Sequence, residues 1–160
     1  MKEKYLRAFM KMAEVFAETS EAKRLKVAAL LIKNGNIVSH AINGTPVGWH
    51  TNECEDKVYQ LDEGGFRTSY YPYSDELGDY RLVTNPFVLH AEQQCLEKMW
   101  HSHETTDGCS MLITHNPCLQ CAVKIKSAGI EKVYYKQDYR DSSGIDYLRE
   151  NNVEVIKLED

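Results

Sequence analysis

The first segment of the chain alternates apolar and charged side chains with a period of three to four residues. This spacing places the apolar side chains on one face of a helix, with Lys and Glu between them. It predicts an amphipathic helix over residues 3–19 that lies against a core. The apolar positions are Leu6, Phe9, Met10, Ala13, Phe16 and Ala17.

Two apolar runs follow, at residues 27–32 and 37–42, with Asn34-Gly35 between them. Asn-Gly readily adopts the backbone angles of a two-residue hairpin turn, so the pattern predicts two antiparallel strands. Residues 43–85 then show no long periodic segment, and we expect a long loop insertion there. A connection of this length inside a compact domain is usually functional or lies at an interface. Its aromatic stretch, with Tyr70, Tyr71 and Tyr73, fits a lid, an interface or a packed loop.

The second half of the chain alternates helical and strand-like segments. This alternation predicts a three-layer α/β/α fold with right-handed crossovers around a five-stranded mixed sheet. The segments are a helix at 90–100, a strand at 111–114, a helix at 118–128 ended by Gly129, a strand at 132–135, a short helix at 145–150 and a strand at 153–156. Because the chain has 160 residues, 42% of them hydrophobic, we expect a single domain over residues 1–160.

Composition narrows the class of function. A net charge of -5 gives no broad basic face for DNA or RNA. No apolar run approaches a membrane span and the N-terminus lacks the apolar core of a signal peptide, so we expect no membrane partner and a cytoplasmic protein. Five cysteines are an odd number, which fits a reducing compartment better than a set of disulfides.

Two short motifs carry the candidate chemistry, His90-Ala91-Glu92 and Pro117-Cys118-Leu119-Gln120-Cys121. The His and the two Cys are the ligands of a catalytic zinc site that leaves a fourth position for water. We expect Asn116 to be the N-cap of the second helix, with Pro117 in its first turn. The two Cys, three residues apart, then share one face at a helix N-terminus, which stabilises their thiolates.

Other interpretations of these residues remain open. A Cys-x-x-Cys pair alone also fits a redox pair or half of a structural four-Cys site. In a non-catalytic binding module, Cys54 or His50 would complete the zinc site, and a general base would have no use. Glu92 favours catalysis, because two thiolates neutralise the formal charge of zinc and leave water less acidic than an all-histidine site does. We expect Glu92 to move protons from water to the substrate and its leaving amine.

H-x-E followed by P-C-x-x-C is the signature of zinc-dependent nucleobase deaminases, and the sequence resembles the cytidine deaminase superfamily. Within it, the sequence is most similar to deoxycytidylate (dCMP) deaminases. The similar segments are Lys26-Val27-Ala28-Ala29, Asn43-Gly44-Thr45-Pro46, Ser127-Ala128-Gly129-Ile130 and Tyr139. The resemblance implies a cytidine-deaminase-like fold and hydrolysis of dCMP to dUMP and ammonia, which supplies dUMP for dTMP synthesis.

The resemblance also implies substrate-binding residues. Asn43 would hold the deoxyribose, Tyr139 the phosphate or the base, and Ala91 would contact the substrate. Arg24 and Lys26, which precede the first strand, are further candidates for contacts with the phosphate.

Members of this family are typically homohexamers that dCTP with Mg²⁺ activates and dTTP inhibits. The resemblance therefore implies an effector pocket near a subunit contact, formed by Gly44, Thr45, Pro46, Gly48, Trp49 and Asn52. We expect one Zn²⁺ per chain, because Ala22 stands where some phage relatives place a Cys for a second zinc, although Cys54 matches the other position. Gln93-Gln94-Cys95 replaces the frequent L-N-A of the family on a helix expected near a neighbouring subunit.

Substrate class separates the remaining alternatives. An enzyme acting on cytosine or adenine in RNA or DNA needs a basic channel for the backbone, which this acidic chain does not suggest. Nucleoside deaminases usually show C-x-E where this chain has His90-Ala91-Glu92. A free nucleotide is therefore the favoured substrate.

Overall fold

The computed structural model of the chain describes residues 1–60, 70–139 and 141–159. Within these residues, no helix is both long and apolar enough to cross a membrane. The elements in chain order are α1 (Glu3–Ala17), β1 (Ala28–Lys33), β2 (Asn36–Ile42), β3 (Glu55–Tyr59), β4 (Tyr73–Asp75), β5 (Gly78–Thr84), α2 (Ala91–Glu97), the 3-10 helix η1 (Lys98–His101), β6 (Ser110–His115), α3 (Leu119–Ser127), β7 (Lys132–Gln137), α4 (Ser143–Glu150) and β8 (Glu154–Lys157).

The main sheet has five strands in the order β2-β1-β6-β7-β8. β1 pairs antiparallel with both β2 and β6, whereas β6, β7 and β8 run parallel. The turn between β1 and β2 holds Asn34 at φ 51° and Gly35 at φ 79°, and two successive positive φ angles are what a two-residue hairpin turn of this kind needs. The predicted hairpin and the five-stranded mixed sheet are confirmed.

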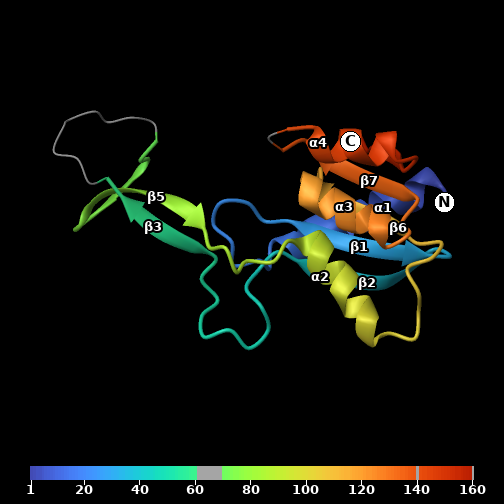
Figure 1. Cartoon of the computed structure of the whole chain (residues 1–160), viewed down its shortest axis with the longest axis horizontal. Coiled ribbons are helices and arrows are strands. Elements are labelled where there is room, and N and C mark those ends of the chain that lie inside the picture. Colours follow the sequence, from blue (N-terminus) through green and yellow to red (C-terminus); the bar gives the residue numbers. More distant parts are fainter. Residues whose placement is uncertain (61–69, 140, 160) are drawn as a thin grey trace.

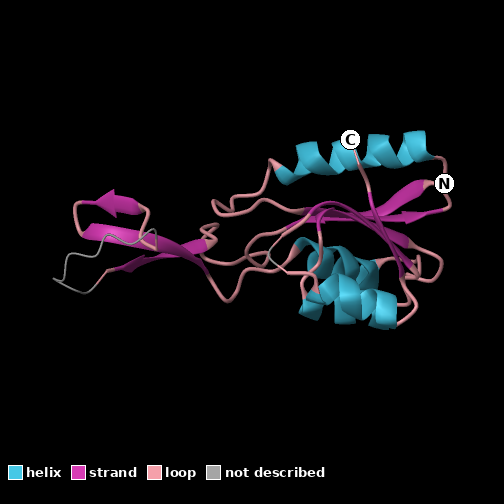
Figure 2. Cartoon of the chain, turned by 90° about the horizontal axis from the view of Figure 1, so that it is seen from above, coloured by secondary structure: helices cyan, strands magenta, loops and turns pink. Residues whose placement is uncertain are grey.

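Helices cover both faces of this sheet (Figure 2). α1 packs on one face, where it meets Ala28, Leu30 and Ile32 of β1. The alternate residues Ala29 and Leu31 belong to the second core, which α2, α3 and α4 cover. β1 contributes to both cores because successive side chains of a strand point to opposite faces. The predicted three-layer α/β/α architecture is therefore confirmed.

A second, smaller sheet extends away from the main body (Figure 1). Its three strands are antiparallel in the order β3-β5-β4, and we call them the arm. The arm falls within residues 43–85, where a long loop was expected, so the expectation of a loop throughout this segment needs correction. Residues 61–69 lie outside the described part of the chain.

Cross-strand contacts link the described strands of the arm, and no residue of these strands belongs to either hydrophobic core. The ring centroids of Tyr59 in β3 and Tyr80 in β5 lie 5.5 Å apart. Tyr73 in β4, the strand on the other side of β5, stacks on Tyr80 with the same separation of 5.5 Å. Lys57 Nζ forms an ion pair with Asp75 at 2.6 Å. Because these side chains are partly exposed, their sequence carries little apolar alternation, which explains why its pattern did not predict strands.

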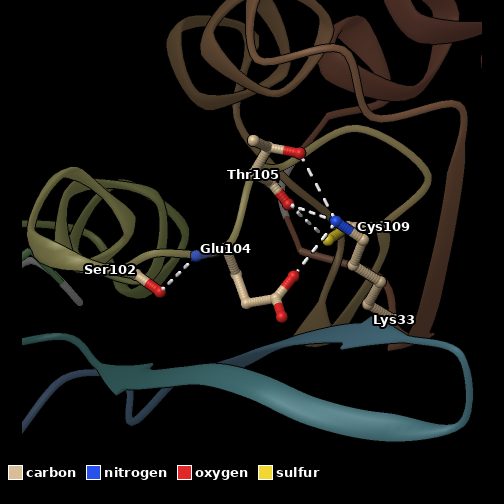
Figure 3. Close-up of polar contacts among 5 residues, drawn as sticks. All are labelled: Lys33, Ser102, Glu104, Thr105 and Cys109. Atoms are coloured by element: carbon tan, nitrogen blue, oxygen red, sulfur yellow. Dashed lines mark hydrogen bonds and ion pairs between the residues drawn. The ribbon is translucent and has the colours of Figure 1, made fainter.

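Lys33, the last residue of β1, fixes the segment between η1 and β6 to the main sheet (Figure 3). Its Nζ lies 3.2 Å from Glu104 Oε2 and donates to the Thr105 carbonyl oxygen at 3.1 Å. The same carbonyl accepts a hydrogen bond from the Cys109 thiol at 3.6 Å. These contacts hold the long connection into β6, the strand that leads to the Cys motif.

Candidate metal centre

The two Cys of the second motif lie at the start of α3. Cys118 is the N-cap residue, and its Sγ accepts a hydrogen bond from the backbone N–H of Cys121 at 3.5 Å. The prediction that Asn116 is the N-cap was wrong. Asn116 is used elsewhere, because its Oδ1 accepts from the Tyr139 backbone N–H and its Nδ2 donates to the Asp141 carbonyl oxygen at 2.8 Å. Asn116 thereby fixes the segment that brings Tyr139 to the site.

His90 reaches the two thiols from the start of α2. It is the N-cap residue of that helix and has extended backbone angles, so the helix itself begins at the next residue, Ala91. Its Nδ1 lies 3.5 Å from Cys118 Sγ and 3.3 Å from Cys121 Sγ. His90 and Cys118 are exposed, whereas Cys121 is buried. The three candidate ligand atoms are therefore gathered at the meeting point of two helix N-termini, open on one side.

This donor set fits a zinc ion. With Zn–S bonds of about 2.3 Å and a Zn–N bond of about 2.0 Å, tetrahedral geometry places the nitrogen about 3.5 Å from each sulfur, which the observed separations match. Among the residues that the structure describes, His90, Cys118 and Cys121 form the group that could hold a metal, and neither Cys54 nor His50 belongs to it. Three protein ligands with an open side are typical of catalytic zinc sites.

Hydrogen bonds among these groups shift their acidity in the metal-free chain. Hydrogen bonds from the Cys121 thiol and from His90 lower the pKa of Cys118 to about 4. The bond to Cys118 raises the pKa of Cys121 and also raises the pKa of His90. Cys118 is thus a thiolate at neutral pH, the form that binds metals.

Glu92 stands in the first turn of α2, two residues after His90, and only 5% of its surface is exposed. Burial raises the pKa of the Glu92 carboxyl to about 7. A carboxyl group with a pKa near the working pH can both accept and return a proton, as a general base and acid must. Its carboxyl group forms a hydrogen bond with the Cys121 side chain and interacts electrostatically with His90 and Cys118, so Glu92 lies beside the three candidate ligands.

A pocket of about 120 Å³ opens next to this group. It brings together seven of the site residues predicted from sequence, and eight other residues complete its lining. The predicted residues that line it are Arg24, Asn43, His90, Ala91, Glu92, Cys118 and Tyr139. Lys26 is not among the lining residues, and its Nζ donates to the Glu18 carbonyl oxygen at 3.0 Å.

Asn43 is held firmly at the edge of this pocket. Its Oδ1 accepts hydrogen bonds from the Val27 backbone N–H and the Ser20 hydroxyl, each at 2.9 Å. Its Nδ2 donates to the Leu25 carbonyl oxygen at 2.8 Å. The side chain therefore joins the end of β2 to the segment before β1, and any contact with a ligand uses its remaining N–H.

Sequence reasoning did not predict three polar residues of the pocket, His115, Glu55 and Thr84. His115 ends β6 directly before the Cys motif, and ligands of open α/β sheets gather outside the carboxyl ends of strands, so its position offered a signal. Glu55 and Thr84 face each other across β3 and β5. Both residues reach the pocket because they lie where the arm joins the main body, and no spacing rule connects them with the two motifs.

The predicted effector residues form the connection between β2 and the arm, and none of them lines the pocket. Gly44 pairs with Leu89 in an isolated β-bridge. Trp49 packs against Phe87 with 4.7 Å between ring centroids, and Gly48 has φ 80°. Thr45, Pro46 and Asn52 belong to the same connection.

Comparison with known proteins agrees with this geometry. The family model of the cytidine and deoxycytidylate deaminase zinc-binding region matches residues 3–137. The dCMP deaminase of cyanophage S-TIM5, whose crystal structure is in complex with dCMP and dUMP, is 44% identical, with a TM-score of 0.79 over 99% of both chains. ComE operon protein 2 of Bacillus subtilis (strain 168) is 28% identical over 95% of this chain and 71% of its own length.

The deoxycytidylate deaminase of Homo sapiens is 31% identical over 84% of this chain and 66% of its own length. The matched family region includes both motifs and every strand of the main sheet except β8. The chain therefore belongs to the family defined by the cytidine and deoxycytidylate deaminase zinc-binding region.

Proposed function

We propose that this protein hydrolyses dCMP to dUMP and ammonia with one zinc ion per chain. The observation that carries the proposal is the buried Glu92 carboxyl beside the group of His90, Cys118 and Cys121, at the wall of one pocket. The cyanophage relative with bound dCMP and dUMP supports this choice of substrate.

When bound to His90, Cys118 and Cys121, zinc supplies a Lewis acid that makes a water molecule more acidic. Glu92 takes a proton from the attacking water and delivers it to N3 of the cytosine ring, while the water oxygen attacks C4. Glu92 then takes the remaining proton from the new hydroxyl on C4 and passes it to the amine, so that the C4 carbonyl forms, the C–N bond breaks, and ammonia leaves. Burial of Glu92 keeps bulk water from competing for these protons.

The rest of the pocket suits a nucleotide. Arg24 places a guanidinium group at the wall, where its Nη1 donates to Thr84 Oγ1 at 3.2 Å, and guanidinium groups bind phosphate well. Asn43 is assigned to the deoxyribose, Tyr139 to the phosphate or base, and Ala91 to contact with the ring. Lys26 is the weaker of the two phosphate candidates, because its Nζ is engaged with a backbone carbonyl.

Regulation and assembly belong to the same proposal. dCTP with Mg²⁺ activates the enzyme and dTTP inhibits it, through a site at Gly44, Thr45, Pro46, Gly48, Trp49 and Asn52. The β-bridge between Gly44 and Leu89 supports a coupling between the effector site and the zinc site, because Leu89 directly precedes His90. We infer a homohexamer of single-domain chains in the cytoplasm, which supplies dUMP for dTMP synthesis. The free state of all five cysteines supports a reducing compartment.

The test is an absorbance assay of dCMP loss and dUMP formation with zinc-loaded protein, with and without dCTP plus Mg²⁺ and with dTTP. Turnover that rises with dCTP and falls with dTTP is the expected result. Turnover that neither dCTP nor dTTP changes would refute the proposed regulation but not the proposed reaction. Deamination of an oligonucleotide and not of dCMP would refute the substrate, and stoichiometric zinc without any turnover would favour a binding module.

A further inference from the structure

Glu55 carries an unusual carboxyl group at the root of the arm. It is the first residue of β3, and only 9% of its surface is exposed. Its Oε1 accepts hydrogen bonds from the backbone N–H groups of Lys23 at 2.8 Å and Arg24 at 3.0 Å. Its Oε2 is buried and has no hydrogen-bond partner within residues 1–60, 70–139 and 141–159.

A buried carboxylate oxygen without a donor is unfavourable, because it has lost water and gained nothing in return. A bound ligand could supply the missing hydrogen-bond donor, because Glu55 lines the same pocket as Glu92. The polar residues that line the pocket come from two separate parts of the fold. Glu92 belongs to the group at the starts of α2 and α3, whereas Glu55 and Thr84 belong to the arm.

The chemistry of dCMP limits which of its atoms can meet Glu55. A carboxylate accepts hydrogen bonds, so its partner must carry an N–H or O–H group. The amine on C4 must lie beside Glu92 for the reaction. The phosphate presents negatively charged oxygens, which a carboxylate repels, and N3 and O2 of the ring are acceptors. The 3′-hydroxyl of the deoxyribose is the donor that remains.

Asn43 supplies the complementary half of such a contact. A hydroxyl both donates and accepts, and the Asn43 amide has two N–H groups. Among the described residues, one of them is used by the Leu25 carbonyl oxygen, while Oδ1 is occupied by two donors. The second N–H can donate to the oxygen of the hydroxyl whose proton Glu55 accepts, and both residues line the pocket.

We propose that Glu55 is a substrate-specificity residue whose Oε2 accepts a hydrogen bond from the 3′-hydroxyl of the nucleotide. The inference rests on the proposed deamination of dCMP and adds the sugar feature that the pocket reads. In this proposal Glu55 binds the sugar, whereas Glu92 transfers protons at the cytosine ring.

The experiment compares kcat/KM for dCMP and for 2′,3′-dideoxycytidine 5′-monophosphate, which lacks only the 3′-hydroxyl. Zinc-loaded wild-type protein should prefer dCMP by on the order of 10- to 100-fold, the usual range for losing a hydrogen bond to a charged group. Glu55→Gln keeps an acceptor for the two backbone N–H groups but turns the second oxygen into a donor. In this variant the preference should fall to within roughly threefold, mainly through slower turnover of dCMP.

Asp56→Asn is the matched control, because Asp56 is the next residue and is exposed. It should retain the wild-type preference. Equal rates of wild-type protein on both nucleotides would overturn the inference while leaving the proposed function intact, and so would a Glu55→Gln variant that slows both substrates equally. If wild-type protein deaminates neither nucleotide, the proposed function itself is wrong and the inference falls with it.

A binding measurement keeps the inference testable if Glu55→Gln does not fold. Calorimetric titration of zinc-loaded wild-type protein with dUMP and with 2′,3′-dideoxyuridine 5′-monophosphate requires no variant and no turnover. Weaker binding of the dideoxy nucleotide by on the order of 10-fold or more is expected. Equal affinities would refute the contact.

Discussion

Gly44 and Leu89 form a reciprocal β-bridge, in which Gly44 N–H donates to the Leu89 carbonyl oxygen at 3.1 Å and Leu89 N–H donates back at 2.8 Å. Leu89 is the residue before His90. The connection after β2 is thereby fastened to the backbone that presents the candidate zinc ligand, although the two segments are far apart in sequence.

The bridge predicts an effect of Gly44→Pro on zinc binding. Proline removes the N–H that donates to Leu89, so His90 loses part of its support, and groups that orient a metal ligand contribute on the order of 10- to 100-fold in metal affinity. A zinc titration against a competing chelator measures this loss. Gly44→Ala is the control, because a Cβ there meets no atom within 4 Å. Unchanged zinc affinity of Gly44→Pro would refute the role of the bridge.

Glu92→Gln should separate proton transfer from metal binding. The amide cannot take up a proton, so kcat for dCMP should fall by roughly 10²- to 10⁴-fold, the usual contribution of a general acid or base. Zinc content, measured by elemental analysis, should stay at one per chain, because Glu92 is not in the ligand group. Cys121→Ser is the opposite case and should lose zinc. Near-normal turnover of Glu92→Gln with zinc bound would exclude the assigned role.

Alkylation of the metal-free protein should discriminate among its thiols. The pKa of Cys118 is lowered to about 4, so its thiolate persists at every pH well above 4 and disappears only as the pH falls through that value. Burial raises the pKa of Cys95 to about 12, and this fully buried thiol should not react at pH 6 to 8. Mass spectrometry after brief iodoacetamide treatment identifies the modified residue.

Zinc should protect Cys118 from this reaction, since a coordinated thiolate no longer attacks the reagent freely. Preferential labelling of Cys95, or labelling of Cys118 that is unaffected by zinc, would contradict the assignment of ligands.

Gly144→Ala should destabilise the protein and weaken zinc binding. A Cβ at Gly144 would lie 2.1 Å from the Pro117 carbonyl oxygen and 2.9 Å from the Cys118 carbonyl carbon. The gain in helix propensity from Gly to Ala is at most about 1 kcal/mol, whereas overpacking typically costs about 1–3 kcal/mol. Because both contacts are with backbone, the clash should dominate. Urea unfolding measures the change in stability, and an unaltered midpoint would show that α4 moves aside without cost.

Much of the main body follows from the sequence, because its elements bury one face and so display a clear period. α1 and the β1–β2 hairpin are examples, and the structure confirms both. The ligand group was predictable for a different reason, since zinc chemistry requires particular side chains and the helix start fixes the spacing of Cys118 and Cys121.

Two features escaped the sequence because they depend on tertiary contacts. Asn116 has the residue type of an N-cap, but its amide bonds the backbone of the segment after β7, and Cys118 takes the cap position. Glu55 looks like an ordinary charged residue in a loop. Its burial arises only when β3 pairs with β5 and the backbone of Lys23 and Arg24 closes over it.

The arm has a consequence for how the native protein opens. Among the described residues of its three strands, Glu55 is the only buried one, so little apolar area opposes separation of these strands from each other. Amide hydrogens of β3 and β5 should therefore exchange with deuterium well before those of β1 and β6, as a low-energy opening unit distinct from global unfolding. Since Glu55 roots this unit in the pocket, nucleotide binding should slow exchange along the arm as well as around the zinc ligands.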